Sequence, residues 1–241
     1  MTDPTPSAHP GEPHLGGTAG RLNKLRAGVL GANDGIVSVA ALVVGVAGAT
    51  PVRGAILAAG AAGLIGGAIS MALGEYVSVS SQRDSERAMI TQERHELDHD
   101  PSAELEELAA LYVAKGLRAE TARQVAEQLS ARDALAAHLD VELNIAPADI
   151  ANPWAAAFSS AAAFTLGGLL PVLTILLLPP PIHIWATFLV VLFALAITGA
   201  AGARLGGSSV LRPTLRVVLG GALALASTFA LGAALGTTVA L

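Results

Sequence analysis

The sequence predicts an all-α membrane protein with five transmembrane helices and a soluble helical insertion between the second and the third. Two observations predict this class. Of the 241 residues, 53% are hydrophobic and only 14% are charged, whereas soluble domains carry about 25% charged residues. The charges are also concentrated, because the stretch from Arg83 to Asp149 holds 15 acids and 7 bases and the rest of the chain is nearly free of charge. This asymmetry is typical of a membrane protein with one soluble insertion.

Five segments are long and apolar enough to cross a bilayer, which takes about 20 residues. They are expected at about 27–49, 54–80, 154–178, 182–203 and 214–239. Residues 1–20 are rich in proline and glycine and predict a disordered tail, whose His9 and His14 are expected to be solvated. The chain therefore divides into a tail (1–20), helices one and two (21–80), the insertion (81–150) and helices three to five (151–241).

The insertion is helical by pattern. The second membrane helix is expected to continue without a break to Asp100, which then caps a new helix with Pro101 at its first position. Gly116 is expected to end that helix. Two more helices follow, at about 119–129 and 131–143, the last ending at Asn144.

The distribution of basic residues predicts the orientation. If the N-terminus is cytosolic, 13 of the 14 lysines and arginines lie on the cytosolic side and only Arg53 lies outside. Because cytosolic loops are enriched in these residues, we expect a cytosolic insertion and a C-terminus on the outer side.

Small residues recur at four-residue spacing in the predicted membrane helices. The pairs are Gly31/Gly35, Gly63/Gly67, Gly202/Gly206 and Gly232/Gly236. Such spacing lets helix backbones approach closely. Close packing within one bundle and a dimer interface are equally good interpretations.

A carboxylate and a thioether are expected at one depth in the membrane. The first two helices form a hairpin around Pro51–Arg53, so residues whose numbers sum to about 105 lie at equal depth, and Asp34 pairs with Met71. A lone methionine is usually a packing residue. An ionisable residue within a membrane segment is instead costly and marks a functional site by default.

Three more polar residues extend this site into a predicted path. Glu75 and Ser78 continue the face of Met71 toward the cytosol, and Asn33 flanks Asp34. Carboxylates suit hard cations and a thioether suits softer ones, so the mixed set favours a borderline ion such as Fe²⁺. Carboxylates also bind protons, which an arriving metal ion would displace.

The insertion holds a second group of candidate metal ligands. Glu93/Glu96 and Glu104/Glu107 are pairs three residues apart on either side of the predicted helix break, and His138 and Glu142 share a face one helix turn apart. A cation site and a solvated acidic face are both compatible with this pattern. Glu96 and His99 also match the Glu-x-x-His spacing of ferritin-like di-iron sites, which require two such motifs; only one is found.

Two long stretches resemble the vacuolar iron transporter (VIT) family. They are "GANDGIVSVAALVVGVAGA" and "GLIGGAISMALGEYVSVSSQRDSE", and the resemblance extends over nearly the whole chain from about Arg21. It implies a homodimer that exports Fe²⁺, and often Mn²⁺ or other divalent metals, from the cytosol in exchange for protons. It also implies a pore at the dimer interface with Asp34 and Met71 as transport ligands, and a metal-binding insertion whose paired glutamates are Glu93, Glu96, Glu104 and Glu107.

The last helix of the insertion departs from the family pattern. It usually supplies a methionine and a glutamate, whereas "AAHLDVELN" supplies His138 and Glu142. Replacing a thioether with an imidazole is expected to shift the preferred ion toward Zn²⁺ or Mn²⁺.

The expected function is proton-coupled export of divalent metal by a chain that is not an enzyme, has no prosthetic group and binds no nucleic acid. The alternative is a membrane-anchored metal sensor or buffer that uses only the acidic insertion. The alanine-rich composition without cysteine suggests a bacterial chain in the plasma membrane; a eukaryotic one would lie in the vacuolar membrane.

Overall fold

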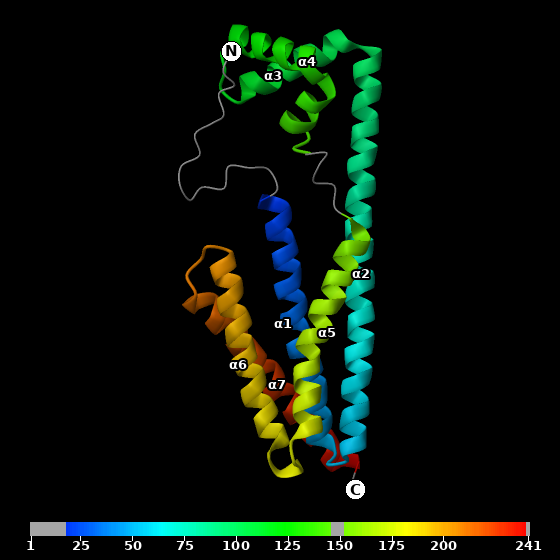
Figure 1. Cartoon of the computed structure of the whole chain (residues 1–241), viewed down its shortest axis with the longest axis vertical. Helices are drawn as coiled ribbons and strands as arrows, with labels where there is room; N and C mark the ends of the chain where they lie inside the picture. Colours follow the sequence, from blue (N-terminus) through cyan, green and yellow to red (C-terminus); the bar gives the residue numbers. More distant parts are fainter. Residues whose placement is uncertain (1–17, 146–151, 240–241) are drawn as a thin grey trace. The chain divides into compact units, whose positions relative to one another are not determined.

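The computed structural model describes residues 18–145 and 152–239, with side chains described over 28–145 and 152–236. Across these residues the chain folds into seven α-helices and no strand (Figure 1). They are α1 (Thr18–Ala49), α2 (Arg53–His99), α3 (Pro101–Ala114), α4 (Ala119–Val141), α5 (Pro153–Leu177), α6 (Pro180–Leu205) and α7 (Leu211–Val239). Residues 1–17, with His9 and His14, lie outside the described residues, and α1 already includes the last three residues assigned to the tail.

The prediction of five membrane-spanning helices is confirmed. α1, α2, α5, α6 and α7 are each long and apolar enough to cross a bilayer, with mean hydropathies between 1.9 and 2.3 over their most apolar windows. α2 continues unbroken to His99, as expected from the absence of any stop signal before Asp100 and Pro101. The chain forms two compact units. The membrane unit contains α1, α2 as far as Tyr76, and α5 to α7. The second unit comprises Val77–Asn152.

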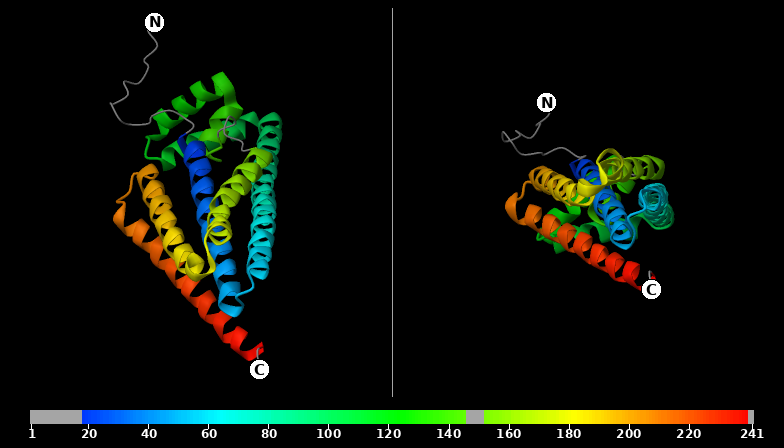
Figure 2. Two further views of the ribbon diagram at one scale, coloured as in Figure 1. Left: turned by 60° about the horizontal axis from the view of Figure 1, so that its bottom comes forward. Right: turned by 90° about the horizontal axis from the view of Figure 1, so that it is seen from below.

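In the membrane unit, α1 packs against α5, α6 and α7 (Figure 2). Two faces of α1 are buried. Ile36, Ala40 and Val44 form one core cluster with Val191 and Leu195 of α6 and Leu225 of α7. Val39 and Val43 form another with Ile56 of α2 and Phe164 and Ile175 of α5. The remaining face of α1, which carries Leu30, Asp34, Ser38 and Leu42, is exposed.

Two of the four predicted glycine pairs pack helices against each other within the protomer. A Cβ atom at Gly35 would overlap the backbone carbonyl of Phe164 in α5, and a Cβ atom at Gly232 would overlap that of Gly45 in α1. The partners Gly31 and Gly236 likewise face backbone atoms of α5 and α1. For these pairs, close packing within one bundle is therefore the correct interpretation.

Arg53, the base predicted on the outer side, joins two helix ends. Its guanidinium donates to the carbonyl oxygen of Ile175 at 3.2 Å and, at shorter range, to that of Leu176. The last carbonyls of a helix lack intrahelical donors. Arg53 therefore stabilises the C-terminal end of α5 and ties the start of α2 to it.

In the second unit, the chain turns from α2 into α3 at Asp100. The Asp100 carboxylate accepts hydrogen bonds from the Ser102 hydroxyl (2.7 Å) and the Ala103 amide (3.0 Å), so it caps α3, with Pro101 in the first turn. These two hydrogen bonds lower the pKa of Asp100. Beyond the end of α3, Gly116 adopts a φ of +100°, which favours glycine and stops the helix as expected.

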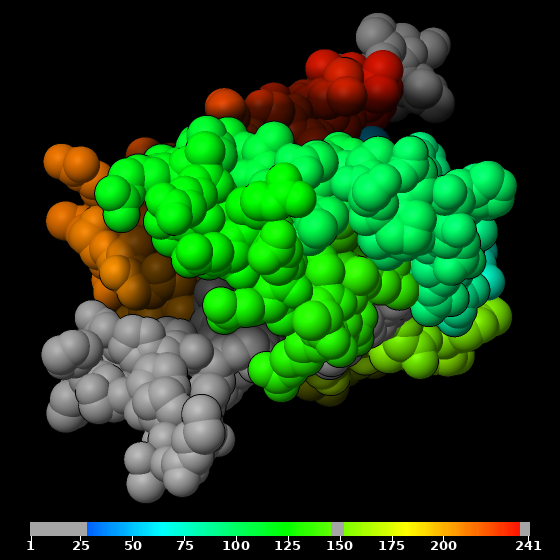
Figure 3. Space-filling view, turned by 90° about the horizontal axis from the view of Figure 1, so that it is seen from above, coloured from blue at the N-terminus to red at the C-terminus, as the bar shows by residue number. Residues whose placement is uncertain are grey.

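One helix break in this unit was predicted a few residues too early. The two helices expected at 119–129 and 131–143 are both present within α4, and the break between them lies at Asp133, whose φ of −165° is not helical. The Asp133 carboxylate accepts the amide of Ala136 at 2.9 Å and so caps the second half. α3 and α4 pack side by side around Leu108, Ala109, Ala126 and Ala137, as their adjoining surfaces in Figure 3 show.

Candidate metal centre

Three ligand-bearing side chains from three helices meet in the second unit. Glu93 comes from α2, Glu104 from the first turn of α3, and His138 from the second half of α4. Their exposed fractions are 3%, 8% and 0%. One ligand atom from each lies within 4.8 Å of the others. Among the described residues, this is the single group of three or more such side chains close enough to share an ion.

Two local breaks in the chain create this meeting point. The cap at Asp100 reverses the chain, so that Glu104 returns toward α2. The interruption at Asp133 redirects the end of α4, which carries His138. Each break lies at an aspartate whose carboxylate caps the helix that follows.

His138 lies among three carboxylates. Its Nδ1 is 3.0 Å from Glu93 Oε1, 3.3 Å from Glu142 Oε2 and 3.9 Å from Glu104 Oε2. The contact with Glu142 has hydrogen-bond geometry. The closer contact with Glu93 does not, because Glu93 Oε1 has no hydrogen-bond partner among the described residues. We therefore treat it as a charge contact alone.

Two buried polar atoms of the cluster are unsatisfied by protein. Besides Glu93 Oε1, the Nε2 atom of His138 has no hydrogen-bond partner among the described residues. Leaving a buried donor or acceptor unpaired costs about 1–3 kcal/mol. A divalent cation bound among the carboxylates would satisfy Glu93 Oε1, so the carboxylate–imidazole donor set fits a metal ion.

The other predicted ligands surround this cluster at more open positions. Burial, followed by the nearby charge of Glu107, raises the pKa of Glu104. Glu96 and Glu142 raise it further, and His138 partly offsets the rise. Glu96 also accepts a hydrogen bond from Gln92 at 3.0 Å. All six predicted residues of the insertion thus belong to one electrostatic group, and the buried members are Glu93, Glu104 and His138.

Metal-free protein is expected to lose stability as the pH rises from 4.5 through the raised pKa of Glu104. Because this pKa is higher in the folded state than the ordinary value of 4.5, the native state holds the proton more tightly than the unfolded state. The resulting stabilisation is complete below pH 4.5 and disappears above the raised pKa. Thermal unfolding of the full chain in detergent with a chelator, followed by circular dichroism across pH, measures the effect.

Residue 104 cannot ionise in the variant Glu104→Gln, so this part of the pH profile should become shallower. A slope remains because burial also raises the pKa of Glu93. Glu120→Gln, at an exposed position of α4, is the matched control and should leave the profile as in wild type. A pH dependence that is identical in all three proteins would contradict the assignment to Glu104.

In the membrane unit, Asp34 lies on the exposed face of α1. Its carboxylate accepts a hydrogen bond of 2.5 Å from the hydroxyl of Ser38, one turn further along the helix. Asn33 points elsewhere, because its side-chain oxygen accepts a short hydrogen bond from Thr198 of α6. Asn33 therefore ties α1 to α6, while Asp34 and Ser38 face out of the protomer.

Met71 and Glu75 are partly buried on α2, and Ser78 is exposed. Met71 packs against the cluster that contains Val39, Val43 and Phe164. A Cβ atom at Gly63 would meet the side chain of Leu42. These two residue numbers sum to 105, which is the sum that pairs Asp34 with Met71. The contact between Gly63 and Leu42 does not involve Asp34 or Met71. The pairing of Asp34 with Met71 as metal ligands therefore stays a prediction.

One buried histidine of the membrane unit was not considered from the sequence. His183, in the first turn of α6, is 6% exposed, and neither ring nitrogen has a hydrogen-bond partner among the described residues. A lone histidine in an otherwise apolar helix was the available signal.

These features define a class, a multi-pass all-helical membrane protein with a buried carboxylate–histidine cluster suited to a divalent cation. The chain belongs to the VIT family, whose model matches residues 25–233. The resemblance noted from "GANDGIVS" and the stretches around it is thereby confirmed.

Relatives match the chain over most of its length. The "Vacuolar iron transporter" of Acanthamoeba castellanii is 47% identical over 223 residues, which cover 92% of this chain and 82% of that protein. "Vacuolar iron transporter homolog 2" of Oryza sativa subsp. japonica is 38% identical, covering 87% and 89%. "Vacuolar iron transporter 1" of Arabidopsis thaliana is 32% identical, covering 92% and 89%. These relatives are transporters, which confirms the prediction that the chain is not an enzyme.

Proposed function

We propose that this protein transports Fe²⁺ or a similar divalent metal ion out of the cytosol in exchange for protons. The observation that carries the proposal is the buried meeting of Glu93, Glu104 and His138, with an unsatisfied carboxylate oxygen on Glu93. The names of the relatives support iron as the substrate. In this proposal the insertion captures metal in the cytosol and raises its local concentration.

The proposed path through the membrane uses Asp34, Met71, Glu75 and Ser78, with Asn33 beside Asp34. Two carboxylates and a thioether form a mixed set that suits a borderline ion. Entry of the ion would displace protons from the carboxylates, which is the elementary step of exchange. In the insertion, His138 contributes a nitrogen ligand and extends the proposed substrates to Zn²⁺ and Mn²⁺.

The proposed assembly is a homodimer. Asp34 is exposed on the protomer, and so are Leu30, Ser38 and Leu42 on the same face of α1. A carboxylate directed at lipid in the membrane interior is costly. A second copy facing this stripe would enclose the carboxylate in a shared, hydrated pore.

The proposed orientation has the N-terminus and the insertion in the cytosol and the C-terminus outside. It rests on 13 of 14 basic residues falling on one side of the predicted spans. We propose the plasma membrane for a bacterial chain and the vacuolar membrane for a eukaryotic one.

Proteoliposomes containing the full chain and an acidic lumen provide the test. With the insertion facing the bath, Fe²⁺ is expected to accumulate inside as luminal protons leave, and collapsing the pH gradient should slow the uptake. Iron uptake and luminal pH are followed together with two fluorescent indicators. Uptake no faster than in protein-free liposomes would overturn the transport proposal.

The alternative is a membrane-anchored sensor or buffer. One observation favours it, because the whole buried cluster lies in one compact unit, Val77–Asn152. This function requires metal binding by the reconstituted protein with no flux. The same liposomes therefore distinguish the two functions when bound and luminal metal are measured separately.

A further inference from the structure

Two exposed histidines lie one turn apart near the end of α2. The rings of His95 and His99 are 3.9 Å apart between centroids and are tilted by 55°. With Glu96 between them, the stretch reads His-Glu-x-x-His, a spacing that directs both imidazoles to one helix face. From the sequence we considered His95 and His99 only as neighbours of the paired glutamates, and we overlooked the His-Glu-x-x-His spacing. The spacing of the two histidines was the signal for the pair.

A backbone contact prepares His99 to bind a metal ion. Its Nδ1 lies 3.0 Å from the carbonyl oxygen of His95. A carbonyl only accepts, so Nδ1 is the donor and Nε2 keeps its lone pair. Metal-binding histidines commonly donate their other ring N–H in this way, which orients the ring. His99 is exposed, so its Nε2 is accessible to an ion from solvent.

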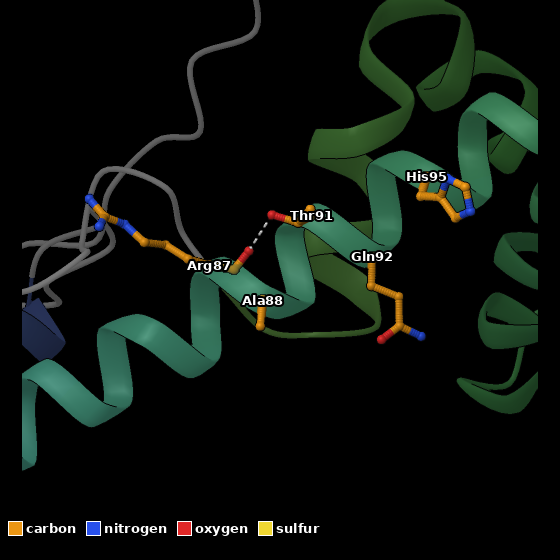
Figure 4. Close-up of a pocket in the computed structure, with 5 residues that line it drawn as sticks. All are labelled: Arg87, Ala88, Thr91, Gln92 and His95. Atoms are coloured by element: carbon orange, nitrogen blue, oxygen red, sulfur yellow. Dashed lines mark hydrogen bonds between the residues drawn. The ribbon is translucent and has the colours of Figure 1, made fainter.

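The surroundings of the pair are open, and they include the C-terminal end of α2. His95 borders a shallow hollow along α2 with Arg87, Ala88, Thr91 and Gln92, all from the same helix (Figure 4). Water can therefore complete the coordination of a bound ion. The C-terminal end of α2 carries partial negative charge, which favours a cation beside its last turn.

We propose that His95 and His99 together bind one borderline divalent ion, such as Zn²⁺, through one nitrogen of each ring, at a site separate from Glu93, Glu104 and His138. Imidazole is a preferred ligand of such ions. No third histidine or carboxylate among the described residues joins the pair within the distance that defines the buried cluster. A hydrolytic zinc site uses three protein ligands, so the pair is assigned to binding alone. This inference concerns the insertion and holds whether or not the chain transports metal.

Zn²⁺ titration of the full chain in detergent, without an affinity tag, tests the proposal. The background is His9→Ala/His14→Ala, which removes the histidines of the N-terminal residues. Calorimetry is expected to resolve two classes of site. His95→Ala and His99→Ala should each weaken the same class by about tenfold or more, because each removes half of a chelate. The double variant should be no weaker than the weaker single variant, and His138→Ala should affect the other class.

A rearranged pair provides the matched control. Arg94→His/His95→Ala keeps two exposed histidines but separates them by about 140° around the helix, so it should bind as weakly as His95→Ala. The proposal is overturned if this variant binds like wild type or if His95→Ala/His99→Ala leaves both classes unchanged. Loss of both classes in that double variant would overturn the separation of the two sites. Unchanged circular dichroism establishes that the variants are folded.

Discussion

Replacing Asp34 with alanine is expected to lower the rate of metal transport by at least about a hundredfold. Removing even a partner of a metal ligand costs 10–100-fold in affinity or activity, and this variant removes the proposed charged ligand itself. Asp34 is also the one acidic residue of α1, so no other carboxylate on that helix can replace it. Initial rates of Fe²⁺ uptake into proteoliposomes, normalised to reconstituted protein, measure the effect.

Leu30→Ala is the matched control, because Leu30 is exposed on the same face of α1 one turn earlier. It should transport at close to the wild-type rate. Metal binding to the insertion should be the same in both variants, which separates loss of flux from loss of capture. If Asp34→Ala transported as fast as Leu30→Ala, the proposed membrane site would be wrong.

Replacing Gly232 with alanine is expected to destabilise the membrane unit by about 3 kcal/mol or more, at the upper end of the cost of overpacking. The added Cβ atom would overlap the backbone carbonyl of Gly45, so α1 and α7 must separate. A backbone carbonyl cannot rotate away as the end of a side chain can. Thermal unfolding in detergent, followed by circular dichroism, measures the loss.

Gly220→Ala is the control within the same helix. A Cβ atom there meets nothing within 4 Å. Alanine also favours a helix by up to about 1 kcal/mol over glycine. This variant should therefore unfold at or slightly above the wild-type temperature. Equal unfolding temperatures for the two variants would show that the crossing of α1 and α7 tolerates a methyl group.

Local signals made much of the fold predictable. Long apolar runs are sufficient for the five spanning helices, because each must satisfy its own backbone in lipid. Asp100, Pro101 and Gly116 act on the adjacent backbone and determine where α3 begins and ends. The break in α4 was misplaced because Asp133 is one of several residues in that stretch able to interrupt a helix, and packing against α3 selects among them.

The candidate site was predictable as a set of residues but not as an arrangement. Helical spacing places Glu93 with Glu96 and Glu104 with Glu107, yet it does not tell which member of each pair is buried. Which member is buried depends on how α3 and α4 pack, because this packing buries Glu93, Glu104 and His138. The spacing of Gly31 with Gly35 likewise left packing within the bundle and dimerisation equally possible.

The sequence by itself determined the five spans, the continuous α2 and the family, because these depend on hydropathy, helix-ending residues and long motifs. Only the tertiary structure decided which side chains meet. It directs Asn33 to Thr198 while Asp34 faces out. The physical reason is that a helix presents every face, and the face it buries is chosen by contacts with segments far away in the chain.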